Sequence, residues 1–156
     1  MNDGAPTPRT TRILGLDAGD RRIGVAISDP DRSFALPLRS ILADGREMDA
    51  IRTLVVAEEV GELVIGLPLS LSGEDSAQTQ RVRDFANRLE AHLLLPVHLW
   101  DERLSTAEAQ RLAEDTGRSR GRRGRARQAP PIDTDALAAS IILQAYLDRL
   151  RFQRNA

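Results

Sequence analysis

Three short segments of strand-like composition precede the first helical segment of this chain. They cover residues 12–17, 22–28 and 34–41, and Pro37 in the third favours an edge strand or a bulge. Helical and strand-like segments alternate from there on. Three strands followed by alternating helices and strands predict an α/β fold, in which helices flank a mixed sheet and the later strands of the sheet are parallel.

The alternating part begins with a helix from about Asp44 to Glu59, which Gly61 can end. Two short apolar runs read as buried strands, and three further segments have helical patterns. We expect strands at 63–67 and 97–100, and helices from about 76 to 93, from Ser105 to Thr116 and from Asp133 or Thr134 to Leu150. The predicted order is βββαβαβαα, with five strands in one sheet.

The chain has 156 residues, which fits one domain at 12–151 with tails at 1–11 and 152–156. No apolar run approaches the roughly 20 residues that span a membrane, so we expect a cytoplasmic protein without a membrane partner. There is no cysteine and there are two histidines, which argues against a zinc site. Any metal would be held by oxygen ligands, which favours Mg²⁺ or Mn²⁺.

Six arginines and no acid occur between residues 118 and 127, and the net charge of the chain is −1. Without those six charges the remainder carries −1 − 6 = −7. A basic segment on an acidic body predicts that a polyanion approaches at one place. We expect a mobile arginine-rich loop at 117–130, with the phosphate contacts made by Arg118, Arg120, Arg122 and Arg123.

Acidic residues occur where three of the predicted elements meet loops. Asp17 ends the first strand before a glycine-rich turn, Glu102 follows the strand at 97–100, and Asp135 lies in the first turn of the last helix. A carboxylate at the end of an apolar strand is costly without a partner or a metal. Alternation alone does not decide between Asp101 and Glu102.

Ala138 and Ala139 follow Asp135 on one helix face, and their small side chains allow that helix to approach the sheet closely. The three acids could then converge on one or two divalent ions, a site suited to phosphoryl chemistry. Asp101 and Asp133 are the less favoured ligands. Basic and turn residues border the acids and suit backbone-phosphate contacts: Gly19, Arg21, Arg22, Arg103 and Ser105.

Four motifs in order give the chain a family resemblance. They are Leu16-Asp17-x-Gly19-x-x-Arg22-Ile23-Gly24-Val25-Ala26-x-Ser28-Asp29, Gly66-Leu67-Pro68, Asp101-Glu102-Arg103-Leu104-Ser105-Thr106, and Asp135-x-x-Ala138-Ala139-x-Ile141-Ile142-Leu143-Gln144-x-Tyr146-Leu147. Together they resemble the YqgF family, also called RuvX-like, over residues 13–148.

The resemblance implies a ribonuclease H-like fold and a nuclease that matures the 5′ end of pre-16S ribosomal RNA in the bacterial cytoplasm. It also implies a relation to Holliday junction resolvases of the RuvC kind, and it maps the catalytic acids to Asp17, Glu102 and Asp135. Such resolvases carry a second acid three residues before the last; here that position is Ile132, which argues against vigorous resolvase activity.

The leading interpretation is therefore a metal-dependent phosphodiesterase acting on structured RNA, in which Asp17 bridges two ions and cleavage leaves a 5′-phosphate. We expect a monomer or weak homodimer that works alone or with ribosomal particles. Three alternatives stay open: a resolvase of branched four-way DNA, a ribosome-assembly or nucleic-acid-binding factor without catalysis, and an actin-like ATPase. The last needs two such domains, more than 156 residues hold.

Replacing Arg120, Arg122 and Arg123 with alanine tests the role of the arginine-rich segment. If these residues contact phosphates, RNA binding weakens and its dependence on salt becomes shallower, because fewer counterions are released. Filter-binding measurements over a salt series report both quantities. Unchanged affinity at low salt would show that the segment is only a linker.

Overall fold

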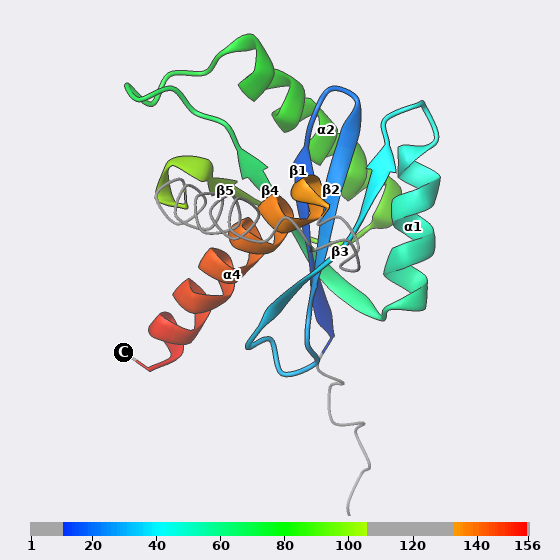
Figure 1. Cartoon of the computed structure of the whole chain (residues 1–156), viewed down its shortest axis with the longest axis vertical. Helices are drawn as coiled ribbons and strands as arrows, with labels where there is room; N and C mark the ends of the chain where they lie inside the picture. Colours follow the sequence, from blue (N-terminus) through cyan, green and yellow to red (C-terminus); the bar gives the residue numbers. More distant parts are fainter. Residues whose placement is uncertain (1–10, 106–132, 156) are drawn as a thin grey trace, which may run out of the picture.

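The computed structural model describes residues 11–105 and 133–155. Five strands and four helical segments follow one another along this part of the chain (Figure 1). They are β1 (Arg12–Ala18), β2 (Arg22–Ser28), β3 (Ala35–Leu42), α1 (Glu47–Ala57), β4 (Val60–Leu67), α2 (Ala77–Leu93), β5 (Val97–Asp101), the 3₁₀ turn η1 (Glu102–Leu104) and α4 (Thr134–Arg154). The helix predicted from Ser105 to Thr116 and the loop at 117–130 lie outside the described residues.

The five strands form one mixed sheet in the order β3-β2-β1-β4-β5. β1, β2 and β3 pair antiparallel, whereas β1–β4 and β4–β5 are parallel. The register of β2 and β3 shifts between Val25 and Ala26, where Pro37 lies opposite Ala26. Pro37 thus stands on an edge strand beside a bulge, and the α/β mixed sheet is confirmed.

Helices cover both faces of this sheet. One face packs α1 and α2 on a large aliphatic core that includes Leu14, Leu16 and Ile65. The other face packs α4 on a smaller core that includes Ile13, Val64 and Leu143. Figure 1 shows α4 crossing its face over the central strands. Because side chains alternate along a strand, Asp17 lies on the α4 face, like Ile13.

Glycines on the central strands let α4 lie unusually close to the sheet. A methyl group on Gly15 of β1 would come within 2.7 Å of Leu143 Cβ, and one on Gly24 of β2 would overlap the carbonyl oxygen of Asp135. On Gly66 of β4 it would come within 2.6 Å of Ile142. The absence of side chains at these positions therefore sets how closely the first turns of α4 approach β1, β2 and β4.

Helix caps fix where the helices start. Asp133 caps α4, because its side chain accepts hydrogen bonds from the backbone N–H groups of Asp135 and Ala136. Ser76 and Thr79 form a capping box at the start of α2. These caps place the first turn of α4 over Gly24 and the first turn of α2 above the end of β4.

Three details differ from the sequence-based expectations. Gly61 does not end α1; it lies inside β4, and the chain turns instead at Glu59, whose φ is 53°. A helix-ending glycine is favoured but not obligatory, since the turn occupies a single left-handed residue. α4 also continues past Leu150 to Arg154.

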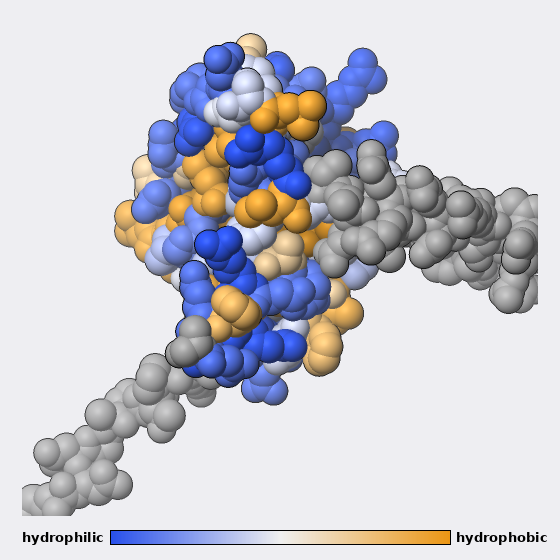
Figure 2. All heavy atoms as spheres, turned by 90° about the vertical axis from the view of Figure 1, so that its left-hand side faces the viewer, coloured by the Kyte–Doolittle hydropathy of each residue, from blue (hydrophilic) through white to orange (hydrophobic). Residues whose placement is uncertain are grey.

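The sequence predicts a buried strand at 97–100, but β5 is an edge strand whose residues are at most half-buried. Leu99 is 38% exposed and Leu104, just beyond the strand, is 60% exposed. Figure 2 views the molecule from this side and shows apolar residues exposed among hydrophilic ones. A short apolar run therefore did not distinguish a central strand from an edge strand. None of the helices in the described residues is both long and apolar enough to cross a membrane.

Adding a methyl group at Gly24 or at Gly66 tests the close approach of α4. Gly24→Ala meets backbone atoms of Asp135, so it must push α4 away from the sheet, whereas Gly66→Ala meets the ends of the Glu102 and Ile142 side chains. We expect a loss of about 1–3 kcal/mol for Gly24→Ala and a smaller loss for Gly66→Ala, measured by urea unfolding. Equal stability of both variants and the wild type would contradict this packing.

Candidate active site

Asp17 lies near the carboxyl end of β1, between two glycines on the neighbouring strands. Gly24 is its direct partner on β2. On the other side Leu16 lies opposite Ile65 of the parallel strand β4, so Gly66 comes next to Asp17. Because neither neighbour has a side chain, the sheet surface is open on both sides of the Asp17 carboxylate.

Glu102 fills the opening on the β4 side. It is the first residue of η1, directly after β5, and a methyl group on Gly66 would come within 2.6 Å of its Oε1. Its carboxyl group is hydrogen-bonded to that of Asp17. Two of the three predicted acids are therefore in direct contact.

Asp101 and Glu102 have separate roles, a choice that alternation alone left open. Asp101 belongs to β5, and its carboxylate caps η1 by accepting from the Arg103 backbone N–H at 3.0 Å. It also accepts from the Arg103 guanidinium at 2.7 Å. Asp101 is thus paired with Arg103, and Glu102 is the acid that reaches Asp17.

Asp135 fills the opening on the β2 side. Its backbone lies directly over Gly24, and its carboxylate Oδ2 is 3.4 Å from the hydroxyl of Ser40 and 3.9 Å from Nε of Arg22. Asp133, the other acid at this helix, accepts a 2.6 Å hydrogen bond from Ser40 while it caps α4. Asp135 is therefore beside Asp17, with its carboxylate held toward β3.

Burial and neighbouring negative charges raise the pKa values of Asp17 and Glu102. Desolvation raises the pKa of Asp17, and the negative charge of Asp135 raises it further. Desolvation and then the charge of Asp17 raise the pKa of Glu102 to about 7. Both shifts favour the protonated forms of Asp17 and Glu102.

The donor set of this pocket fits a hard divalent cation only in part. Two half-buried carboxyl groups in contact, with a third close enough to raise the Asp17 pKa, are the ligand type that Mg²⁺ and Mn²⁺ prefer. Across residues 11–105 and 133–155, however, no three His, Cys, Asp or Glu side chains are placed to hold an ion together. Asp17 and Glu102 are in contact, whereas the Asp135 carboxylate lies beside the Ser40 hydroxyl.

The basic and turn residues expected to bind nucleic acid differ in their placement. Arg21 and Arg22 are exposed, and the Gly19 N–H closes the β1–β2 turn by donating to the carbonyl of Arg22. Arg103 is occupied by Asp101. Ser105 is buried and accepts a 3.0 Å hydrogen bond from the indole of Trp100, so its position gives no support to nucleic-acid binding. Arg118, Arg120, Arg122 and Arg123 lie outside the described residues.

Two contributions to the site were not anticipated from the sequence. Ser40 connects β3 to Asp133 and Asp135, but a serine within a strand has no distinguishing pattern. Gly66 makes room for Glu102, although the motif Gly66-Leu67-Pro68 supports the family resemblance without indicating this close approach. A glycine inside an apolar strand is a usable signal for close approach.

Comparison with known proteins places this geometry in a family. The family model RuvX, described as Holliday junction resolvase, matches residues 11–149. A protein of Koribacter versatilis named "Putative pre-16S rRNA nuclease" is 43% identical over 146 residues, covering 92% of this chain and 91% of its own length. A protein of the same name from Orientia tsutsugamushi is 43% identical over 145 residues, covering 92% and 88%.

Solved structures agree on the fold. Thermus thermophilus RuvC in complex with a Holliday junction substrate has a TM-score of 0.61 at 14% identity and covers 92% of this chain and 96% of its own. Another structure of RuvC from this organism has a TM-score of 0.54 at 13% identity, covering 90% and 97%. These likenesses show a ribonuclease H-like fold, and the family model and the relatives show that the chain belongs to the RuvX (YqgF) family of nucleases.

Proposed function

We propose that this protein is a metal-dependent phosphodiesterase that matures the 5′ end of pre-16S ribosomal RNA in the cytoplasm. The contact between the Asp17 and Glu102 carboxyl groups, with Asp135 beside them, is the observation that carries the proposal. The names of the relatives from Koribacter versatilis and Orientia tsutsugamushi supply the substrate.

Asp17 and Glu102 would hold the cation, and Asp135 would complete the site by rotating its side chain. Burial, and then the charge of Asp17, raise the pKa of Glu102, so the pair contributes little to stability when ionised but attracts a compensating positive charge. When bound, Mg²⁺ or Mn²⁺, as one ion or two, would neutralise the acids and stabilise the charge that develops on the phosphate.

Other residues position the acids and the substrate. The Ser40 hydroxyl holds Asp133 as the cap of α4 and lies close to Asp135, so it fixes the start of the helix against β3. Arg22 is 64% exposed, and its Nε lies 3.9 Å from Asp135, a loose pair that it can exchange for a phosphate oxygen of the substrate. Arg22 thus binds and orients the phosphate next to Asp17.

Resolution of four-way DNA is the second candidate, because the matched family model is described as a Holliday junction resolvase. Incubating the pure protein with a labelled rRNA precursor and with a four-way DNA junction, in parallel, separates the two substrates. Cleavage of the junction in preference to the RNA would replace the first candidate with the second.

Asp17→Asn tests the cation site and the chemistry together. Divalent cation raises the stability of the wild type because it binds the folded state alone, by about 2.7 kcal/mol at 100-fold excess over Kd. The variant loses this rise and cleaves no precursor RNA, and it keeps the RNA affinity measured in EDTA. Thermal unfolding with and without Mn²⁺, beside gel assays of cleavage, measures both. Cleavage at the wild-type rate by the variant would remove Asp17 from the mechanism.

Glu102→Gln tests the electrostatic origin of the site. The folded-state pKa of Glu102 lies near 7, above its ordinary value of 4.5, so its contribution to stability is complete below about pH 4.5 and is lost as pH rises to about 7. In EDTA we therefore expect Tm of the wild type to fall across this window. Tm of Glu102→Gln should fall less and exceed that of the wild type at about pH 8.

The exposed residue Glu90 of α2 gives a matched control, since Glu90→Gln removes the same charge far from Asp17. Its Tm should follow the wild-type dependence on pH. A wild-type Tm that rises between about pH 5 and about pH 7 in EDTA by more than that of Glu102→Gln would contradict the sign assigned to this pair.

A further inference from the structure

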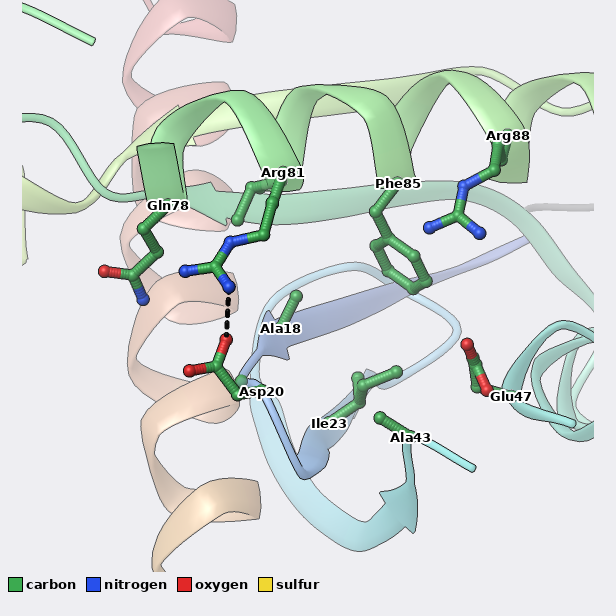
Figure 3. Close-up of a pocket in the computed structure, with 11 residues that line it drawn as sticks. Ala18, Asp20, Ile23, Ala43, Glu47, Gln78, Arg81, Phe85 and Arg88 are labelled. Atoms are coloured by element: carbon green, nitrogen blue, oxygen red, sulfur yellow. Dashed lines mark ion pairs between the residues drawn. The ribbon is translucent and has the colours of Figure 1, made fainter. Parts of the chain in front are cut away.

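A cavity of about 270 Å³ lies on the face of the sheet opposite Asp17 and Glu102, between the β1–β2 turn and α2 (Figure 3). Ala18, Gly19 and Asp20, the three residues after Asp17, form one wall. α2 forms the facing wall. The cavity therefore opens beside the carboxyl end of β1 that carries Asp17, although the sheet separates it from the acid pair.

Apolar side chains form the floor of the cavity. Ile23, Val82 and Phe85 line it, and each is at most 6% exposed because it also belongs to the larger core. In Figure 3 the Phe85 ring points down between Arg81 and Arg88 toward Ile23. A flat apolar ring can cover such a surface without moving the backbone.

Polar groups stand at both ends of this surface. Arg81 and Asp20 form an ion pair of 3.5 Å at one end, where both side chains are more than half exposed. At the other end Figure 3 shows Arg88 above Glu47. Each end thus offers one donor group and one acceptor group, and the two arginines and two acids cancel to a net charge of zero. This favours a neutral ring with polar edges over a free anion.

Arg88 is the group whose contacts point most clearly to a ligand. Its guanidinium lies 5.8 Å from the centre of the Phe85 ring. Within residues 11–105 and 133–155 it has no carboxylate within 4 Å, in contrast to Arg81 and Arg83 of the same helix. Arg88 can therefore stack on a flat ligand or donate to its edge without breaking an ion pair.

We propose that this cavity binds one unstacked nucleobase of the strand that is cut. The proposal rests on the proposed function, since it identifies the ligand from the substrate of the neighbouring site. Unstacked bases of single-stranded RNA present an apolar ring face together with donor and acceptor edges, which are the two features of this cavity. Ala18, Gly19 and Asp20 line the cavity and directly follow Asp17, so a strand with a phosphate at Asp17 has the cavity just across the β1–β2 turn.

The base would lie against Ile23 and Phe85 with Arg88 at its side, and Asp20 and Gln78 would face one edge. The site then fixes which nucleotide beside the scissile phosphate is held, and so where the strand is cut. A free nucleotide has the same ring chemistry. However, only an RNA strand can contact both Asp17 on one side of the β1–β2 turn and the cavity on the other, and so bind more tightly.

Binding without cleavage tests this assignment. The probe is a labelled RNA that spans the 5′ end of 16S rRNA and its precursor extension, with single abasic substitutions on either side of the cut, titrated with the full chain in EDTA. For the wild type, one abasic position should weaken binding about tenfold, as expected for the loss of one stacked base. Ala43→Leu fills the cavity without changing charge. Both this variant and Arg88→Met should bind intact RNA more weakly than the wild type, and neither should lose further affinity at the abasic position (the abasic penalty).

Arg149→Met, an exposed arginine of α4, is the matched control and should retain the abasic penalty. Thermal unfolding shows whether Ala43→Leu is folded. If it is not, Arg88→Met still tests the proposal, because Arg88 is exposed and its replacement leaves the core intact. An abasic penalty unchanged in both cavity variants would overturn the proposal, as would a penalty absent from the wild type. The proposal would also be overturned if AMP or GMP shifted the NMR signals of Phe85 while no abasic position weakened RNA binding. That result would identify a site for a free nucleotide. Failure of the wild type to cleave with Mn²⁺ would refute the proposed function instead.

Discussion

The close approach of α4 to the sheet is the constraint on which the site depends. Gly15, Gly24 and Gly66 carry no side chains toward α4, so the helix start lies on β2 and Glu102 lies on β4. Asp17, between Gly24 and Gly66, is then bordered by a helix on one side and a carboxylate on the other. Packing of the smaller core beneath α4 holds this arrangement at a fixed distance.

The close approach of the Asp17 and Glu102 carboxyl groups lowers the stability of the protein at the site. Asp17 and Glu102 are brought together in a partly desolvated place where their charges repel, and the pKa of Glu102 rises to about 7 as a result. The surrounding carboxylates are arranged differently, since Asp101 is paired with Arg103 and Asp133 caps α4. Two of the nearby acids therefore hold the backbone, whereas Asp17 and Glu102 contact each other, and we propose that this pair attracts a cation.

Sequence patterns were sufficient for the strands and the mixed sheet, because these follow from local composition and from the order of the elements. They were not sufficient where the role of a residue or the position of a strand depends on a neighbour from another part of the chain. Asp101 and Glu102 differ only in the face to which they point, and the edge position of β5 depends on which strands pair. Ser40 gained its role from a helix almost a hundred residues later. The cavity beside α2 likewise combines residues from four elements that no spacing relates.

We propose above all that Asp17 and Glu102 bind a divalent cation, with Asp135 as a third ligand. Anomalous scattering from crystals of the protein grown with Mn²⁺ tests it most directly. We expect a peak within coordination distance of a carboxylate oxygen of Asp17 and of Glu102, with the Asp135 carboxylate turned away from Ser40 toward it. Well-ordered crystals saturated with Mn²⁺ that show no peak between these two acids would contradict it.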